Sequence, residues 1–185
     1  MGDQGSEGLF SPFLRRRRVE AVRSLLDDRV LDFGCGTGKL AELCDPSQYC
    51  GVDISDAALD LARRNHPHHR FAKELPEAEV FDTIVGLAVI EHVKQPASLL
   101  ERFRKLVTAE GQLILTTPHP TFGLVHDFGA MLGLFSKEAS DEHETLLDRE
   151  LMLAIARTSG WNLVSAHRFL FGANQVFVLH PTSDP

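Results

Sequence analysis

The stretch Val30–Gly38, with the sequence VLDFGCGTG, constrains the fold of this chain more than any other part of it. A short apolar run leads directly into three closely spaced glycines, and Leu40 and Leu43 follow at helical spacing. Glycine suits a tight turn, and it lets a ligand approach the backbone without a Cβ in the way. The pattern therefore predicts a buried strand, a turn that binds a ligand, and a short helix running to Cys44.

The rest of the chain alternates strand-like and helix-like segments. Apolar runs predict strands at 49–53, 68–71, 81–85, 112–117, 161–168 and 175–179, with a turn at Glu110-Gly111. Helical spacing predicts helices over 14–28, after the N-cap Ser55, from Pro96 and over 149–159. This alternation indicates an α/β fold with a mostly parallel sheet covered on both faces. Ligands of such sheets bind beyond the carboxyl ends of the strands.

The spacing of polar and glycine residues around this turn indicates the kind of ligand. Asp53 ends the next predicted strand, where a carboxylate can accept hydrogen bonds from both hydroxyls of a ribose. A dinucleotide-binding fingerprint would require glycine at Lys39, and a phosphate-binding Walker A loop fails at Phe33 and at Leu40. The cluster therefore favours a nucleoside cofactor that has no pyrophosphate.

These segments of the sequence resemble the motifs of a known family. Val30–Gly38 resembles motif I of class I S-adenosylmethionine-dependent methyltransferases, and residues 51–55 resemble their ribose-binding motif. Residues 81–85 and 106–115 are similar to the fourth strand and to the turn and strand that follow, in the family's order. The resemblance implies an α/β fold with a single Rossmann-like domain. Its mostly parallel seven-stranded sheet would have helices on both faces and an antiparallel last strand.

Residue composition and pattern indicate the domain limits, and the resemblance implies a cofactor site. Residues 1–13 would be a flexible N-terminus, 14–185 the methyltransferase domain, and 119–148 a lid over the acceptor site. The cofactor would be S-adenosylmethionine. Many relatives have an acidic residue at the adenine edge where this chain has Phe71, and Asp32 could instead simply brace the glycine turn. The residues expected to bind the cofactor are Asp32, Gly34, Cys35, Gly36, Gly38, Asp53, Ile54, Phe71, Ala72 and Leu87.

The expected acceptor is a small molecule methylated on O, N or C, as in the quinone-biosynthesis type of methyltransferase. A hydroxyl acceptor is helped by a general base, for which histidine is the common choice near neutral pH. The candidates are His143, His126 and His119, with His143 favoured by its spacing ahead of the helix at 149. The pair Glu91-His92 resembles part of a metal site in RNA methyltransferases. The further glutamate of that site is replaced by Ala88, so no metal is expected.

Composition limits the partners. The net charge of −7 disfavours nucleic-acid binding, and no apolar run reaches the roughly 20 residues that span a bilayer. With no hydrophobic signal core and three cysteines without a CxxC pair, free thiols and a cytoplasmic location are expected. The basic run Arg15–Arg18 is interpreted as a solvated helix face rather than a functional patch.

Two other functions stay open at this point. A nicotinamide-dependent oxidoreductase has a similar fold, although Lys39 in place of the third fingerprint glycine argues against it. A non-catalytic partner protein that binds S-adenosylmethionine would need no substrate domain of its own. Oligomeric state is not specified by the sequence.

Overall fold

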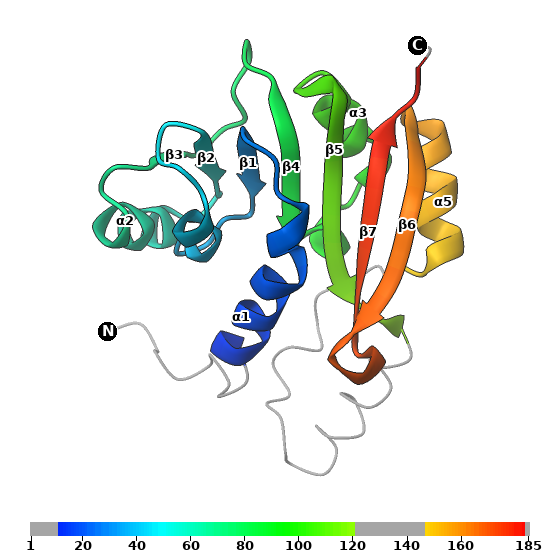
Figure 1. Ribbon diagram of the computed structural model, residues 1–185, viewed down its shortest axis with the longest axis horizontal. Helices are drawn as coiled ribbons and strands as arrows, with labels where there is room; N and C mark the ends of the chain where they lie inside the picture. The colour runs from blue at the N-terminus through cyan, green and yellow to red at the C-terminus, as the bar shows by residue number, and fades with distance from the viewer. Residues whose placement is uncertain (1–10, 121–146, 184–185) are drawn as a thin grey trace.

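A computed structural model describes residues 11–120 and 147–183 of the chain. Its seven described strands form one sheet in the order β3-β2-β1-β4-β5-β7-β6 (Figure 1). Strands β1 to β5 pair in parallel, whereas β7 runs antiparallel to both β5 and β6. The predicted α/β fold, with a mostly parallel seven-stranded sheet and an antiparallel last strand, is confirmed. The strands are β1 (Val30–Phe33), β2 (Tyr49–Val52), β3 (Arg70–Ala72), β4 (Phe81–Leu87), β5 (Val107–Pro118), β6 (Trp161–Phe169) and β7 (Asn174–Pro181).

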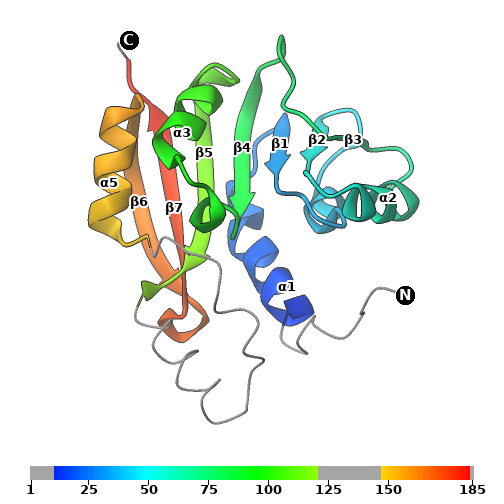
Figure 2. The same ribbon diagram turned by 180° about the vertical axis from the view of Figure 1, so that it is seen from behind.

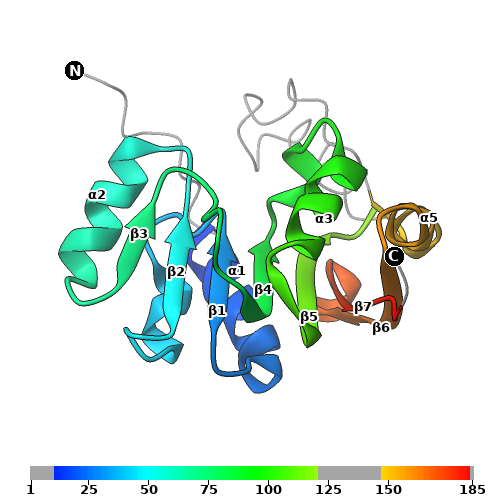
Figure 3. The ribbon, with the colours of Figure 1, turned by 90° about the horizontal axis from the view of Figure 1, so that it is seen from above.

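Helices cover both faces of the sheet (Figures 2 and 3). On one face α3 (Pro96–Arg104) and α5 (Arg149–Thr158) bury residues such as Phe103 and Met152 in a shared core. On the other face α1 (Ser11–Val22) and α2 (Asp56–Asn65) bury residues such as Val22 and Leu59 in a second core. The sheet therefore lies between two apolar layers, which leaves its carboxyl edge as the place where polar loops gather. Short 3₁₀ helices complete the description: η1 (Arg23–Leu25), η2 (Lys39–Leu43), η3 (Ile90–His92) and η5 (Leu170–Gly172).

Local signals explain where several helices begin. The hydroxyl of Ser55 accepts a hydrogen bond from the Ala58 amide at 3.3 Å, as expected for an N-cap. Pro96 occupies the first turn of α3. Asp148 caps α5, because its carboxylate accepts the Leu151 amide at 2.8 Å. The predictions for Ser55 and Pro96 are confirmed, and α5 begins at the predicted residue.

Several predicted bounds and element types were wrong. The first helix begins at Ser11 and ends as an α-helix at Val22, and the short helix after the glycine turn is a 3₁₀ helix. The predicted turn at Glu110-Gly111 lies inside the long strand β5. Here the register between β4 and β5 shifts, and a Cβ on Gly111 would come within 2.7 Å of the Asp82 carbonyl oxygen. Gly111 therefore lies where β4 and β5 approach each other closely at a shift in their register, and it does not form a turn.

The predicted lid, residues 119–148, lies mostly outside the described residues. Among the helices that the structure describes, none has the length and apolar character needed to cross a membrane.

Candidate functional site

The carboxyl ends of β1, β2 and β4 meet at one edge of the sheet, which is the lower edge in Figure 1. The glycine turn follows β1, Asp53 follows β2, and Ala88 follows β4. Because these strands are parallel neighbours, three segments that are distant in sequence are brought side by side. This is the edge where ligands bind in open α/β sheets.

The glycine turn has a backbone conformation that residues other than glycine rarely adopt. Gly34, Gly36 and Gly38 have φ values of +74°, +52° and +81°. The amides of Gly34 and Cys35 both donate to the Val52 carbonyl, at 2.8 and 3.1 Å, which fixes the turn to β2. A Cβ added to Gly36 would meet nothing within 4 Å, so the turn leaves open space above this residue.

Asp53 joins three strands at this edge. Its carboxylate accepts the Gly36 amide at 2.8 Å through one oxygen and the Ser55 amide at 2.9 Å through the other. Its own amide donates to the Ala72 carbonyl at 3.2 Å. A carboxylate oxygen can accept more than one hydrogen bond, so this half-buried group can still accept hydrogen bonds from a ligand. Beside it, 85% of the Ile54 side chain is exposed, which is unusual for a large apolar residue.

Asp32 lies below the turn and is 2% exposed. The Tyr49 hydroxyl donates to its carboxylate at 2.7 Å. Burial raises the pKa of Asp32 to about 7, against the lowering effect of the Tyr49 hydrogen bond and with a smaller contribution from Asp53. Next to it, burial also raises the pKa of the Cys35 thiol well above its usual range, so this sulfur is a poor nucleophile.

The remaining residues predicted at the cofactor site differ in exposure. Phe71 is 8% exposed, and its ring lies against Gly38 and Gly51, where an added Cβ would come within 3.1 and 2.7 Å of it. The Phe71 ring therefore supports the turn from within the core. Ala72 and Leu87 are half-buried at the ends of β3 and β4.

The three candidate bases are not equally placed. His126 and His143 lie outside the described residues. His119 follows β5, is 6% exposed, and donates its amide to the Ala173 carbonyl at 2.9 Å. Its pKa is lowered by burial first and by the positive charge of Arg168 second, with Asp148 opposing. It lines a pocket of about 230 Å³ that is separate from the glycine turn.

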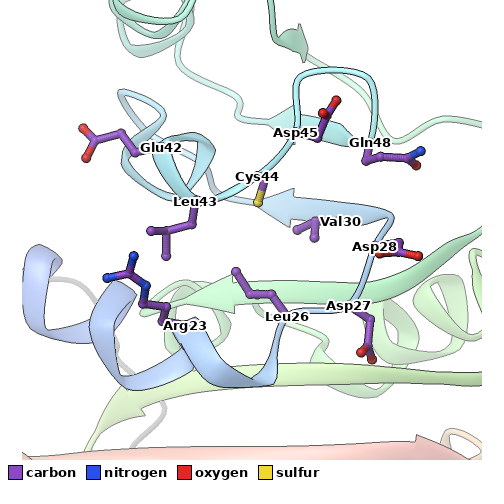
Figure 4. Close-up of a pocket in the computed structure, with 10 residues that line it drawn as sticks. All are labelled: Arg23, Leu26, Asp27, Asp28, Val30, Glu42, Leu43, Cys44, Asp45 and Gln48. Atoms are coloured by element: carbon purple, nitrogen blue, oxygen red, sulfur yellow. The ribbon is translucent and has the colours of Figure 1, made fainter.

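A larger pocket, of about 420 Å³, lies at the opposite edge of the sheet (Figure 4). It opens between η1 and η2, with Leu26, Leu43 and Cys44 inside and Asp28 and Asp45 at the rim. None of the residues predicted for the site lines it. No group of three or more histidine, cysteine or acidic residues able to hold a metal occurs in the part of the chain that the structure describes.

Two residues near the site were missed by the sequence analysis. The guanidinium of Arg15 donates to the Thr37 hydroxyl in the glycine turn at 3.4 Å. The guanidinium of Arg18 donates to the side-chain oxygen of Asn174, at the start of β7, at 2.9 Å. Within the basic run, only Arg16 and Arg17 form the exposed face that was expected. The available signal was helical spacing, since positions 15 and 18 share a face with the buried Val19 and Val22.

Comparisons with known proteins agree with this geometry. Residues 9–166 match a family described as a methyltransferase domain. The chain is 32% identical over 121 residues to a ubiquinone biosynthesis O-methyltransferase of Aromatoleum aromaticum, covering 59% of this chain and 52% of that protein. It is 29% identical over 140 residues to a malonyl-[acyl-carrier protein] O-methyltransferase of Halalkalibacterium halodurans, covering 62% and 52%. The chain thus spans about half the length of these curated relatives.

Solved structures share the fold. A magnesium protoporphyrin IX methyltransferase of Synechocystis, crystallised with bound SAH, matches with a TM-score of 0.72 at 18% identity, over 98% of this chain and 90% of that one. A possible histamine N-methyltransferase of Thermotoga maritima matches with a TM-score of 0.73 at 19% identity, over 92% of each chain.

Proposed function

This chain belongs to the methyltransferase domain family, and from that membership we propose that it transfers a methyl group from S-adenosylmethionine to a small-molecule acceptor. When bound, the cofactor supplies a methyl group on a sulfonium, which needs no further activation. The protein then has to bind the cofactor, align the acceptor and exclude water.

The observation that supports this proposal most directly is the hydrogen bond between the glycine turn and Asp53. The Gly36 amide donates to the Asp53 carboxylate at 2.8 Å, and the space above Gly36 is open. A carboxylate held beside an open glycine backbone suits a ribose, whose two hydroxyls are hydrogen-bond donors. The residues present therefore fit a nucleoside cofactor.

Each predicted cofactor residue has a role in this proposal. The backbone of Gly34, Cys35, Gly36 and Gly38 forms the cradle, and Asp53 takes the ribose. Ile54, with 85% of its side chain exposed, offers an apolar surface for the adenine together with Ala72. Phe71 acts from below by supporting Gly38 and Gly51.

Charged groups and a strand end complete the cofactor site. Asp32 places a buried acid near the amino-acid end of the cofactor, and Leu87 contributes backbone there. Arg15, which contacts Thr37, supplies a cation beside the glycine turn.

The acceptor side of the proposal is less complete. His119 is the candidate general base within the described residues, because its lowered pKa favours the neutral imidazole, which is the form that can accept a proton. His126 and His143 remain candidates for the same role. Two relatives are named as O-methyltransferases, one of ubiquinone biosynthesis and one of malonyl-[acyl-carrier protein], and these names support an acceptor with an oxygen atom to be methylated.

Calorimetric titration tests the cofactor assignment. S-adenosylhomocysteine, NAD and NADP are titrated into the wild type, into Asp53→Ala, and into the control Asp60→Ala, an exposed acid on α2. We expect S-adenosylhomocysteine alone to bind, with affinity lost by at least tenfold in Asp53→Ala and kept in Asp60→Ala. A nicotinamide cofactor binding in its place would support an oxidoreductase and contradict the proposal. Binding without turnover on a broad acceptor panel would support the non-catalytic alternative.

A further inference from the structure

The pocket beside His119 opens at the same edge of the sheet as the glycine turn. We name it the His119 pocket; its lining includes His119 after β5, Asp148, Arg149 and Glu150 at the start of α5, and Arg168 near the end of β6. Only β4 separates β5 from β1 in the sheet, so the pocket and the glycine turn lie along the same edge with one strand between them. Its volume of about 230 Å³ suits a small organic group.

The two arginines of the pocket keep their hydrogen-bonding capacity. Across residues 11–120 and 147–183, neither Arg149 nor Arg168 makes a side-chain hydrogen bond or an ion pair, and both are exposed. Asp148 and Glu150 line the same pocket without pairing to them. The Asp148 carboxylate is instead engaged with the Leu151 amide of its own helix, at 2.8 Å. Two guanidinium groups are therefore available to a ligand.

The carboxylates of Asp148 and Glu150 balance the two guanidinium groups in charge, so selection of an anion depends on geometry rather than on net charge. The first turn of α5, a helix of ten residues, carries the partial positive charge of a helix N-terminus, which the Asp148 cap offsets in part. The pKa of His119 is lowered by burial and by the positive charge of Arg168, which favours the neutral imidazole. A guanidinium matches a carboxylate through two parallel hydrogen bonds, which a neutral amide does not reproduce.

We propose that the His119 pocket binds a carboxylate of the methyl acceptor, and that Arg149 and Arg168 are the residues that select an acidic acceptor. This inference rests on the proposed function, because it names the substrate class of the same site. The acceptor is then an organic acid whose carboxylate lies between the two guanidinium groups, with His119 beside it.

Binding of a simple probe tests this without turnover. Benzoate, and its neutral counterpart benzamide, are titrated into the full chain while the His119 imidazole is followed by NMR. The signal is assigned from the spectrum of His119→Asn, or by backbone correlation if that variant does not fold. The same titrations are made on Arg149→Gln, Arg168→Gln and the control Arg157→Gln, which is exposed at the other end of α5.

We expect benzoate to shift the His119 signal to saturation and to raise the pKa of this imidazole, because a nearby anion stabilises the imidazolium. Arg149→Gln and Arg168→Gln should each weaken benzoate by about tenfold, with Arg157→Gln unchanged. The inference is overturned if benzoate gives no saturable shift, if benzamide binds equally well, or if both pocket variants bind as the wild type does. Calorimetry with S-adenosylhomocysteine on the same samples reports separately on the proposed function.

Discussion

At the scale of single residues, two acids that stand at neighbouring strand ends have opposite environments. Asp53 is half-buried and accepts two backbone amides, so its carboxylate is fixed in place where a ligand can reach it. Asp32 is 2% exposed and accepts only the Tyr49 hydroxyl among the described residues. Burial therefore makes Asp32 an acid whose protonation changes near neutral pH.

The first prediction concerns the stability of the fold as a function of pH. The pKa of Asp32 is about 7 in the native protein and 3.8 in the unfolded chain, so the native state retains a proton that the unfolded state loses between these values. This contribution is complete below about pH 4, and the free energy of unfolding then falls by up to about 1.4 kcal/mol per pH unit, levelling off above pH 7.

The variant Asp32→Asn removes this titration. We expect the variant to gain stability relative to the wild type as the pH rises from 4 to 7, as measured by urea unfolding at each pH. Tyr49→Phe is the companion variant, because it removes a hydrogen bond that lowers the pKa but leaves the acid, so the pH dependence should persist and extend to higher pH. Parallel pH profiles of the wild type and Asp32→Asn would contradict the assigned pKa.

The second prediction separates two glycines of the same turn. A Cβ at Gly34 would lie 2.8 Å from Val89 Cγ2, whereas one at Gly36 would meet nothing within 4 Å. Both have positive φ, which costs an alanine about 1 kcal/mol. We expect Gly34→Ala to lose about 3 kcal/mol of stability in urea unfolding, because overpacking adds to this strain, and Val89→Ala to restore part of the loss.

Gly36→Ala should behave in the opposite way. It is expected to lose only about 1 kcal/mol of stability. Its methyl group would occupy the open space assigned to the cofactor, so the affinity for S-adenosylhomocysteine should fall by at least tenfold in calorimetry. Equal effects of the two alanines on stability and on affinity would contradict the arrangement of the turn.

At the scale of secondary-structure elements, sequence patterns predicted the structure where local chemistry decides it. β1 has the predicted bounds, Ser55 and Pro96 start helices as expected, and the order of strands and helices follows the apolar spacing. Gly111 was misassigned because glycine marks both turns and close strand approaches. Only the neighbouring strand, through the Asp82 carbonyl, distinguishes the two.

Tertiary contacts determine the features that the sequence patterns did not predict. The engagement of Arg15 and Arg18 depends on where α1 docks, and the burial of Phe71 depends on how it packs against Gly51. Neither can be derived from local spacing. The individual cofactor residues predicted from sequence therefore stay predictions, although Gly36 and Asp53 do meet.

The third prediction concerns η5, which connects β6 to β7. Leu170 and Phe171 have φ values of +52° and +54°, and the Phe171 ring is fully exposed. A bulky residue in this conformation is strained, whereas asparagine tolerates it and a β-branched residue does not. We expect Phe171→Asn to stabilise the protein by about 1 kcal/mol and Phe171→Val to destabilise it by a similar amount. Thermal unfolding measures both, and a Val variant as stable as the Asn variant would contradict the strain.

At the scale of the whole molecule, the proposed cofactor site lies where both apolar layers meet the sheet edge. The glycine turn rests on Phe71 of the α1–α2 layer, and Gly34 abuts Val89, which comes just before the buried Ile90 of the α3–α5 layer. Asp53 links the ends of three strands. A ligand bound at this place therefore contacts segments that belong to the cooperative core, and its binding energy should stabilise the whole domain.

The last prediction uses this linkage. S-adenosylhomocysteine at about 100 times its Kd should stabilise the native state by about 2.7 kcal/mol. For a domain of this length, 185 residues, that corresponds to a rise in Tm of roughly 5–10 °C. Asp53→Ala should show at most about half of this rise, NAD should give none with either protein, and Asp60→Ala should match the wild type. A transition that splits in two, with only one part shifted, would show that the cofactor turn is not coupled to both layers. An unshifted Tm for the wild type would remove the basis for placing the cofactor at this edge.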